Sequence, residues 1–306
     1  MSAAVAVAFT GALVVVILRR REEFAEAIGG ATFGVLALAT LLQVVALLAR
    51  TEAWHLCIEA AGGTVPRRAL YRASGLGSLG SQLNSQVGTA ARITALRKTV
   101  PDAAPLIPAL IAAEVPIIVI EAGYGAISSF TLVGPLGLPW WFPIVFLVLV
   151  AAIAYGLGRV GKGHETGWRT GLAVLAHLDG RNRTIFFVAI AICAQITRNW
   201  MMLHAIGIDA SFWDANAILI AQAVLSQLPL GPSTGAAAVS SILNTNAFVD
   251  TAAAGVLLTA TGTMGALVFV LWAGGDMAWH ARRARPPAAP PPPPPDPRPP
   301  EGELRS

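Results

Sequence analysis

Apolar segments long enough to cross a bilayer recur along this chain, and they restrict its fold more than any other feature. A helix needs about 20 apolar residues to span the hydrocarbon core. The segments that reach or approach this length are 3–18, 31–49, 106–130, 138–159, 184–205 and 253–275. Only 12% of the residues are charged, against about 25% in a soluble domain. The sequence therefore predicts an all-α polytopic membrane protein with about six spanning helices.

Two further segments are too interrupted to be ordinary spanning helices. Residues 74–92 are rich in glycine and small polar residues, and residues 217–243 contain Pro229 and Pro232 within LPLGPSTG. Each proline removes a backbone donor and clashes with the preceding turn. Such a structural break survives in a membrane only where protein or water surrounds it. We therefore expect each segment to enter the membrane and return, as a re-entrant hairpin of half-helices.

The distribution of basic residues favours two such hairpins. If both segments return to the side from which they enter, nearly all basic clusters share one side, which the positive-inside rule makes cytoplasmic together with the C-terminus. The hairpins then enter from opposite faces, and interrupted segments in corresponding halves of a chain are typical of an inverted-repeat transporter. Because the composition rich in Ala, Arg and Pro suggests a bacterial source, we expect a multi-pass protein of the bacterial cytoplasmic (inner) membrane.

A change of composition near residue 282 divides the chain into two parts. Residues 1–281 are expected to form a transmembrane domain, and residues 282–306 a disordered Pro-rich tail. The tail contains RPPAAPPPPPPDPRPP, which can form only polyproline II or disordered chain. The formal net charge of +4 is small, and most basic residues lie beside apolar segments. We therefore expect no nucleic-acid partner.

Several polar residues fall inside the expected membrane segments, where ionisable groups mark a pathway or a buried pair. Glu114 and Glu121 are seven residues apart and share one face of a helix. We expect Arg198 and Arg92 to meet a phosphate, because the planar guanidinium binds phosphate in a bidentate manner. In the alternative interpretation, the two glutamates only pair with these arginines, and Arg198 extends to the outer interface.

The two structural breaks also place helix N-termini inside the membrane. A helix N-terminus carries about half a positive charge and binds anions. Gly88 and Thr89 lie at one expected N-terminus, and Ser233 and Thr234 lie at the other. Gln222 precedes the second break, where it either contacts a ligand or forms an inter-helix hydrogen bond.

Other residue patterns exclude several classes of function. We find no P-loop, dinucleotide fingerprint or nucleophile elbow, and the histidines and the two cysteines lack metal-ligand spacing. We therefore expect no enzymatic activity, no cofactor and no metal. The remaining aromatic signal is a set of tryptophans near the expected interfaces, which predicts an aromatic belt. These residues are Trp54, Trp140, Trp141, Trp200 and Trp213.

Four short motifs, in this order, carry a family resemblance. They are RTEAWHLCIEAAGG (50–63), LNSQVGTAAR (83–92), AAEVP (112–116) and LPLGPSTG (228–235). The chain resembles the lysylphosphatidylglycerol synthase transmembrane region, also called the flippase-like membrane family, over most of residues 1–281. No soluble synthase domain is expected after residue 281. The positions that match the family pattern are Asn84, Gly88, Arg92, Glu114, Pro229 and Pro232.

The resemblance implies a membrane protein that moves a lipid with a charged or sugar-bearing head group between leaflets. The family usually has an acidic residue where this chain has Thr89, and a Pro-Gly-Gly with a nearby glutamate where this chain has Pro232, Ser233 and Thr234. This chain therefore resembles a divergent member for which an anionic lipid fits best. The candidate substrate-binding residues are Asn84, Gly88, Thr89, Arg92, Glu114, Glu121, Arg198, Gln222, Ser233 and Thr234.

Two hypotheses for function follow. In the first, the chain is a flippase for an anionic, phosphate-bearing or isoprenoid-linked (polyprenyl) lipid of the cytoplasmic membrane. In the second, it transports nothing and is a scaffold or accessory subunit for a membrane enzyme, a lipid-modifying glycosyltransferase, with the Pro-rich tail as a tether.

Overall fold

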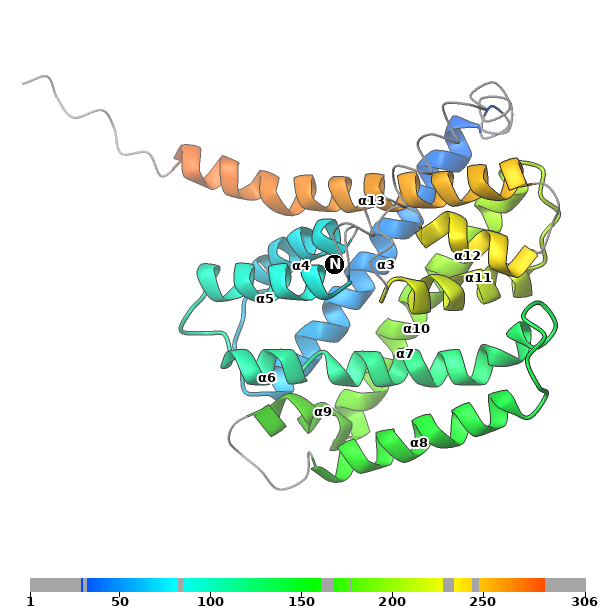
Figure 1. Cartoon of the computed structure of the whole chain (residues 1–306). Coiled ribbons are helices and arrows are strands. Elements are labelled where there is room, and N and C mark those ends of the chain that lie inside the picture. The colour runs from blue at the N-terminus through cyan, green and yellow to red at the C-terminus, as the bar shows by residue number, and fades with distance from the viewer. Residues whose placement is uncertain are drawn as a thin grey trace, which may run out of the picture.

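The computed structural model describes most of the membrane domain (Figure 1). The described residues are 29, 32–81, 85–160, 168–176, 178–227, 234–243 and 248–283. The apolar segment 3–18 and the tail from residue 284 onward lie outside them. Every regular element in the described ranges is a helix. The predicted all-α fold is therefore confirmed for this part of the chain.

Five helical segments are long and apolar enough to cross a membrane, and they coincide with five of the predicted spans. Their bounds are Phe33–Ala60, Ile107–Leu132, Phe142–Val160, Asp179–Ala205 and Ala252–Gly275. They correspond to helix α3 (Phe33–Ala60), the series α6 (Ile107–Ala112), α7 (Val115–Ser128) and η1 (Ser129–Leu132), helix α8 (Phe142–Val160), and most of α10 (Leu178–Ala205) and α13 (Phe248–Arg283). The chain is a polytopic membrane protein.

Helix α3 is longer than predicted. The sequence after residue 49 contains neither glycine nor proline until Gly62, where the backbone takes a left-handed conformation with φ of +83°. Glycine adopts this conformation without steric strain. The helix therefore continues to Ala60, with Trp54 buried in the core and Arg50 half-buried, whereas the sequence placed Arg50 among the basic residues beyond a membrane span.

The predicted continuous helix 106–130 is interrupted at Ala113 and Glu114. Pro116 lies in the first turn of α7, where its missing N–H cannot bond to the carbonyl of residue 112. The seven-residue spacing of Glu114 and Glu121 was assigned to one uninterrupted helix, and this was wrong in detail. Both residues nevertheless face the same cavity.

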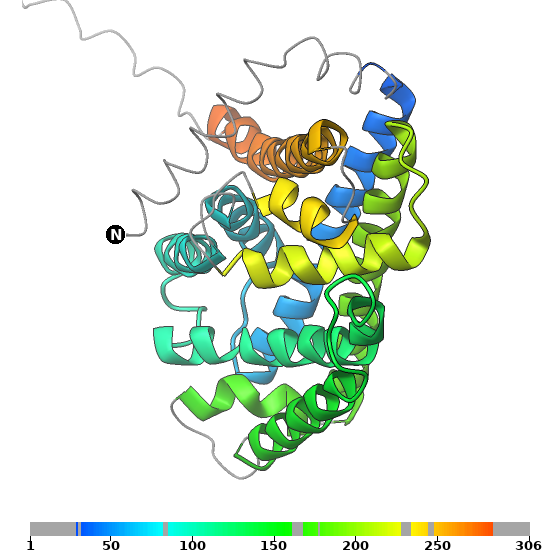
Figure 2. The ribbon, with the colours of Figure 1, turned by 45° about the vertical axis from the view of Figure 1, so that its right-hand side comes forward.

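Residues 74–92 reverse direction as predicted, because α4 (Arg67–Ser81) and α5 (Ser85–Thr99) lie side by side (Figures 1 and 2). Glycines allow the two backbones to approach closely. A Cβ atom on Gly88 would lie 2.7 Å from the carbonyl oxygen of Gly77, and one on Gly80 would lie 3.2 Å from the Cα of Gly88. A larger side chain at Gly88 would separate the two helices.

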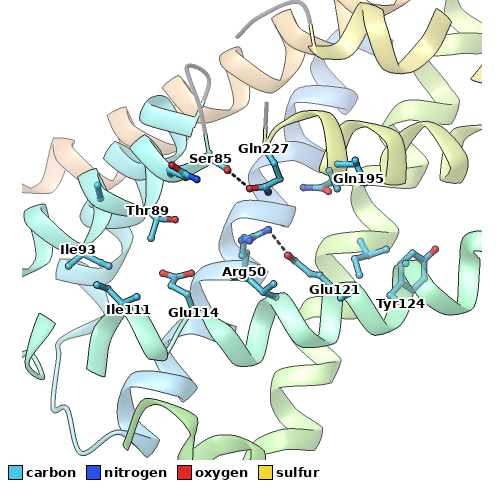
Figure 3. A pocket seen from close by; sticks show the side chains of 18 of the residues that line it. Arg50, Ser85, Thr89, Ile93, Ile111, Glu114, Glu121, Tyr124, Gln195 and Gln227 are labelled. Atoms are coloured by element: carbon cyan, nitrogen blue, oxygen red, sulfur yellow. Dashed lines mark hydrogen bonds and ion pairs between the residues drawn. The ribbon is translucent and has the colours of Figure 1, made fainter. Parts of the chain in front are cut away.

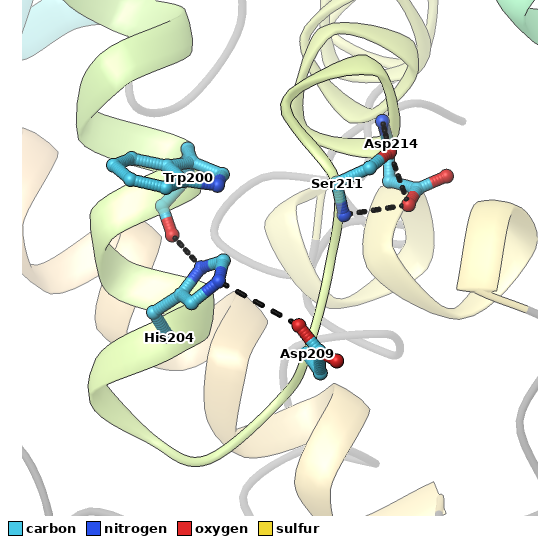
Figure 4. A network of polar contacts seen from close by, with 5 residues as sticks. All are labelled: Trp200, His204, Asp209, Ser211 and Asp214. Carbon is cyan, nitrogen blue, oxygen red and sulfur yellow. Dashed lines mark hydrogen bonds and ion pairs between the residues drawn. The ribbon is translucent and has the colours of Figure 1, made fainter.

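The second hairpin consists of α11 (Phe212–Leu225) and α12 (Thr234–Leu243), the two helices that flank the Pro/Gly break. A capping box starts α11: Ser211 N donates to Asp214 Oδ2 at 2.9 Å, and Asp214 N donates to Ser211 Oγ at 3.1 Å (Figure 4). Just before it, His204 lies 3.9 Å from Asp209. Pro229, Pro232 and Ser233 lie outside the described residues.

The two hairpins approach each other from opposite sides. In Figure 1, α4 and α5 lie to the left and α11 and α12 to the right, with α13 running over both. Ser85, at the start of α5, donates a hydrogen bond from Oγ to Oε1 of Gln227, just after α11, at 3.1 Å. Helices α3 and α10 pack against each other across the molecule. The short elements η2 (Trp168–Leu172) and α9 (Ala173–Ala176) lead into α10.

Candidate functional site

A cavity of about 1410 Å³ lies between the first hairpin and the α6–α7 segment (Figure 3). Helix α5 forms one wall and α6–α7 the opposite wall, while residues of α3, α10 and α11 close its inner side. Most lining side chains are apolar, such as Ile93, Ile111, Ile192 and Leu219. Ser85 and Gln227, the residues that join the two hairpins, also line it, so the cavity reaches the point where the hairpins meet.

A charged pair lies on the inner side of this cavity. Arg50 of α3 donates from Nη1 to Oε1 of Glu121 on α7 at 2.5 Å. The side chains of Arg50 and Glu121 are 37% and 31% exposed, so a molecule that enters the cavity can reach both. Their accessibility makes this pair a contact point for a polar ligand group.

A second charged pair is more deeply buried. Arg92 of α5 forms an ion pair with Glu114, and the two residues are 8% and 5% exposed. The Arg92 guanidinium also lies over the Trp54 ring, 4.5 Å from its centroid. Glu114 lines the cavity, whereas Arg92 is not part of the lining and contacts Glu114 from outside it. The predicted pairing of a glutamate with Arg92 is therefore present.

Arg198 belongs to a separate polar cluster. Its guanidinium donates to Oε1 of Gln43 on α3, and Nη2 donates to Oδ1 of Asn199 at 3.2 Å. Asn199 in turn donates to Oε1 of Gln222 on α11 at 3.4 Å. Arg198 is only 7% exposed, so the alternative in which it extends to the interface is wrong. Gln222 does form an inter-helix hydrogen bond.

The expected joint phosphate site of Arg92 and Arg198 is not assembled. Arg92 contacts Glu114 and Trp54, whereas Arg198 contacts neutral amides, and neither arginine is among the residues that line the cavity. The sequence placed both arginines in expected membrane segments but could not show which neighbours each would meet.

The other predicted residues have different positions. Thr89 lines the cavity, whereas Gly88 is buried against α4. Thr234 begins α12 and is not part of the cavity lining. Asn84 lies outside the described residues, as do Ser233 and the two prolines of the break.

The sequence did not predict the positions of Arg50 and Trp54 in the packed molecule. Arg50 follows the expected end of a span, and Trp54 was assigned to an aromatic belt, but it is completely buried beneath Arg92. The uninterrupted helical sequence from Arg50 to Ala60 was the available signal. Arg97 and Lys98, treated only as topology signals, line the cavity at the end of α5.

Within the described ranges, no group of three or more His, Cys, Asp or Glu side chains could hold a metal ion. The cavity is an apolar space with charged groups on its inner side.

No protein-family model, curated protein or solved structure matches the chain.

Proposed function

We propose that the protein is a lipid flippase that moves an anionic lipid between the leaflets of a membrane. The observation that carries this proposal is the cavity of about 1410 Å³, which combines apolar walls with the charged residues Arg50, Glu114 and Glu121. A lipid needs both environments at once, because its head group requires polar partners and its acyl chains do not.

The side of the cavity formed by α6–α7 supports a lipid rather than a water-soluble ligand. Ile107, Ile111 and Ile118 line the cavity and are 50%, 53% and 54% exposed, and Val224 on the α11 side is 63% exposed. In a membrane domain such exposed apolar side chains face hydrocarbon. Acyl chains can therefore remain in the bilayer while the head group occupies the inner side of the cavity.

The charges of the lining favour a negatively charged head group. The cations Arg50, Arg97 and Lys98 outnumber the carboxylates Glu114 and Glu121 by one. Arginine is well suited to phosphate because its planar group donates two parallel hydrogen bonds. A phosphate-bearing lipid, including a polyprenyl phosphate, fits this lining better than a cationic one.

The distribution of basic residues supports an orientation in the bacterial cytoplasmic membrane. In Figure 1, α5, α8 and α13 end and α6 begins on the same side. Arg97, Lys98 and Arg159 lie at these helix ends. The positive-inside rule makes that side cytoplasmic. We propose that the cavity receives lipid from the cytoplasmic leaflet and that the C-terminus is cytoplasmic.

Reconstitution into liposomes tests the proposal. Proteoliposomes of phosphatidylcholine would contain a trace of fluorescent phosphatidylglycerol or fluorescent phosphatidylcholine, and dithionite would quench the label in the outer leaflet. We expect the wild-type protein to expose the anionic lipid faster than protein-free liposomes do, and to act less on phosphatidylcholine. Replacement Arg50→Gln should slow this about tenfold, which corresponds to about 1.4 kcal/mol in the barrier.

The matched control is Arg159→Gln, the same substitution on α8 outside the cavity lining, where Arg159 contacts Tyr155. It should leave the flipping rate unchanged. If all proteins gave only the protein-free rate, the flippase proposal would fail, and the alternative of a non-transporting scaffold would become the better account. A scaffold would instead depend on residues 285–306, whose deletion should not affect a flippase.

A further inference from the structure

Arg198 is a buried cation for which the described part of the chain supplies no anionic partner. It is 7% exposed, and none of the ion pairs among the side chains that the structure describes includes its guanidinium. Its hydrogen bonds go to the amide oxygens of Gln43 and Asn199, and its Nε atom has no hydrogen-bond partner in the part of the chain that the structure describes. An arginine stays charged, so its positive charge has no compensating carboxylate among these described side chains.

This arrangement is unfavourable unless an anion completes it. Removal of a charge from water without a compensating partner costs several kcal/mol. Arg50 and Arg92 avoid this penalty because each contacts a glutamate. Neutral amides supply hydrogen bonds to Arg198 but no opposite charge.

The surrounding helices allow the Arg198 cluster to sit close to α13. A Cβ atom on Gly262 would lie 3.3 Å from Nη1 of Arg198, and one on Gly265 would lie 2.5 Å from Cγ of Gln43. These two glycines are one helical turn apart, and they leave room for the two polar side chains from α10 and α3. The guanidinium is therefore held at the junction of three helices.

The Arg198 cluster lies next to cavity-lining residues on both α10 and α11. Gln195, which lines the cavity, lies three residues before Arg198 on α10, a rise of about 4.5 Å along the helix. On α11, Gln222 contacts Asn199, while its neighbour Ala223 lines the cavity. Arg198 thus lies outside the cavity lining, one helical turn closer than Gln195 to the C-terminal end of α10.

We propose that Arg198, together with Gln43 and Asn199, forms a second anion site that takes a phosphate group. The unpartnered Nε and the missing counter-charge would both be satisfied by phosphate oxygens. That this phosphate belongs to a lipid head group rests on the proposed function, whereas binding of the anion itself does not. In a flippase the site would receive the head group after it leaves Arg50 and Glu121.

Thermal unfolding of the detergent-solubilised full-length protein tests the site without any transport. The added probes are short-chain phosphatidylglycerol, short-chain phosphatidylcholine and inorganic phosphate. A ligand that binds only the folded state raises the unfolding temperature. We expect phosphatidylglycerol to stabilise the wild-type protein and Arg198→Gln to lose about half of this shift or more. Arg198→Lys, which keeps the charge, should retain more of it than Arg198→Gln.

The unliganded stability distinguishes an anion site from a purely structural arginine. Because Arg198→Gln removes an uncompensated charge and keeps hydrogen-bonding groups, the variant should unfold at the wild-type temperature or above it without added anion. A structural role predicts a lower unfolding temperature and an unchanged response to anions, and this result would overturn the proposal.

The source of the phosphate follows from the two anionic probes. A response to phosphatidylglycerol alone would assign the site to a lipid head group, whereas an Arg198-dependent response to inorganic phosphate as well would show that the free anion suffices. Equal shifts in wild type and Arg198→Gln with both probes would refute the site. That refutation would leave the cavity and its Arg50-dependent flipping untouched, so the two proposals can fail separately.

Discussion

Arg92 and Arg198 are equally buried but have opposite electrostatic surroundings. Arg92 is 8% exposed and contacts Glu114 and the face of Trp54, whereas Arg198 is 7% exposed and, within the described ranges, donates hydrogen bonds to neutral amides alone. A buried ion pair stabilises the fold, whereas a buried charge without a counter-ion can bind an anionic ligand. The comparison indicates that the two arginines have different tasks, although the sequence assigned them one.

The same difference separates the cavity from the cluster behind it. The two ion pairs on the cavity side contain two arginines and two glutamates, so their charges cancel. A lipid phosphate that enters can bind Arg50 in place of Glu121, whose side chain is 31% exposed and can then be solvated in the cavity. The described side chains around Arg198 form no such ion pair, so an arriving phosphate would be the first counter-ion that they meet.

The largest loss of stability is expected when the carboxylate that neutralises Arg92 is removed. Glu114→Gln leaves a buried guanidinium without its partner, and such changes destabilise a protein by about 3–5 kcal/mol. Unfolding in mixed micelles with increasing dodecyl sulfate would measure the loss. The double variant Glu114→Gln with Arg92→Gln should recover most of it. A double variant as unstable as Glu114→Gln would show that charge balance is not what holds this pair.

A smaller loss is expected when the hairpin that positions Arg92 is forced apart. A Cβ atom on Gly88 would lie 2.7 Å from both the carbonyl oxygen of Gly77 and Cβ of Ser81, and overpacking of this kind costs about 1–3 kcal/mol. Gly88→Ala should therefore lower the free energy of unfolding in the same assay. Gly123→Ala is the control, because nothing lies within 4 Å of a Cβ there. Equal effects of the two substitutions would argue against close packing.

The ion pair on the cavity side should matter little for stability. Arg50 and Glu121 are each about one third exposed, and partly solvated pairs contribute about 1 kcal/mol or less. Arg50→Gln should thus unfold nearly as the wild type does while it slows lipid flipping. A loss of several kcal/mol would instead identify Arg50 as a structural residue like Arg92.

The smallest change in stability is expected from a methyl group placed beside Arg198. In Gly262→Ala the new Cβ would lie 3.3 Å from Nη1, so the guanidinium must shift by a few tenths of an ångström. The variant should keep its stability within about 1 kcal/mol and show a reduced thermal shift with phosphatidylglycerol. Gly274→Ala, with open space at its Cβ, should respond to the lipid as the wild type does.

Local sequence patterns could predict the helices but not their partners. The lengths of apolar segments predicted six spans, five of which coincide with helices of the described residues, and the glycine-rich segment 74–92 predicted the chain reversal between α4 and α5. The pairing of Arg50 with Glu121 joins residues 71 positions apart, and that of Arg198 with Gln43 joins residues 155 positions apart. Such contacts depend on how each helix is rotated in the packed molecule, which no local pattern specifies.

The errors in local structure have equally physical causes. Hydropathy falls after residue 49, so the span was ended there, although no glycine or proline interrupts the helix before Gly62. At Glu114 the error was in the other direction: the apolar pattern continues through this point and predicted one helix, whereas Pro116 lies in the first turn of a new helix. Hydrophobicity therefore defined where the membrane segments lie, while backbone chemistry defined where the helices begin and end.

Protection of a single cysteine in the cavity would test most directly whether an anionic head group binds there. Thr89→Cys would be made in a background in which Cys57 and Cys193 are replaced, with Asp102→Cys, an exposed position outside the cavity, as the control. Both variants would be labelled with a charged maleimide in nanodiscs of phosphatidylcholine with or without phosphatidylglycerol. We predict that phosphatidylglycerol slows labelling of Thr89→Cys several-fold and leaves Asp102→Cys unchanged. Equal labelling rates of Thr89→Cys in the two lipids would contradict entry of the anionic head group into the cavity.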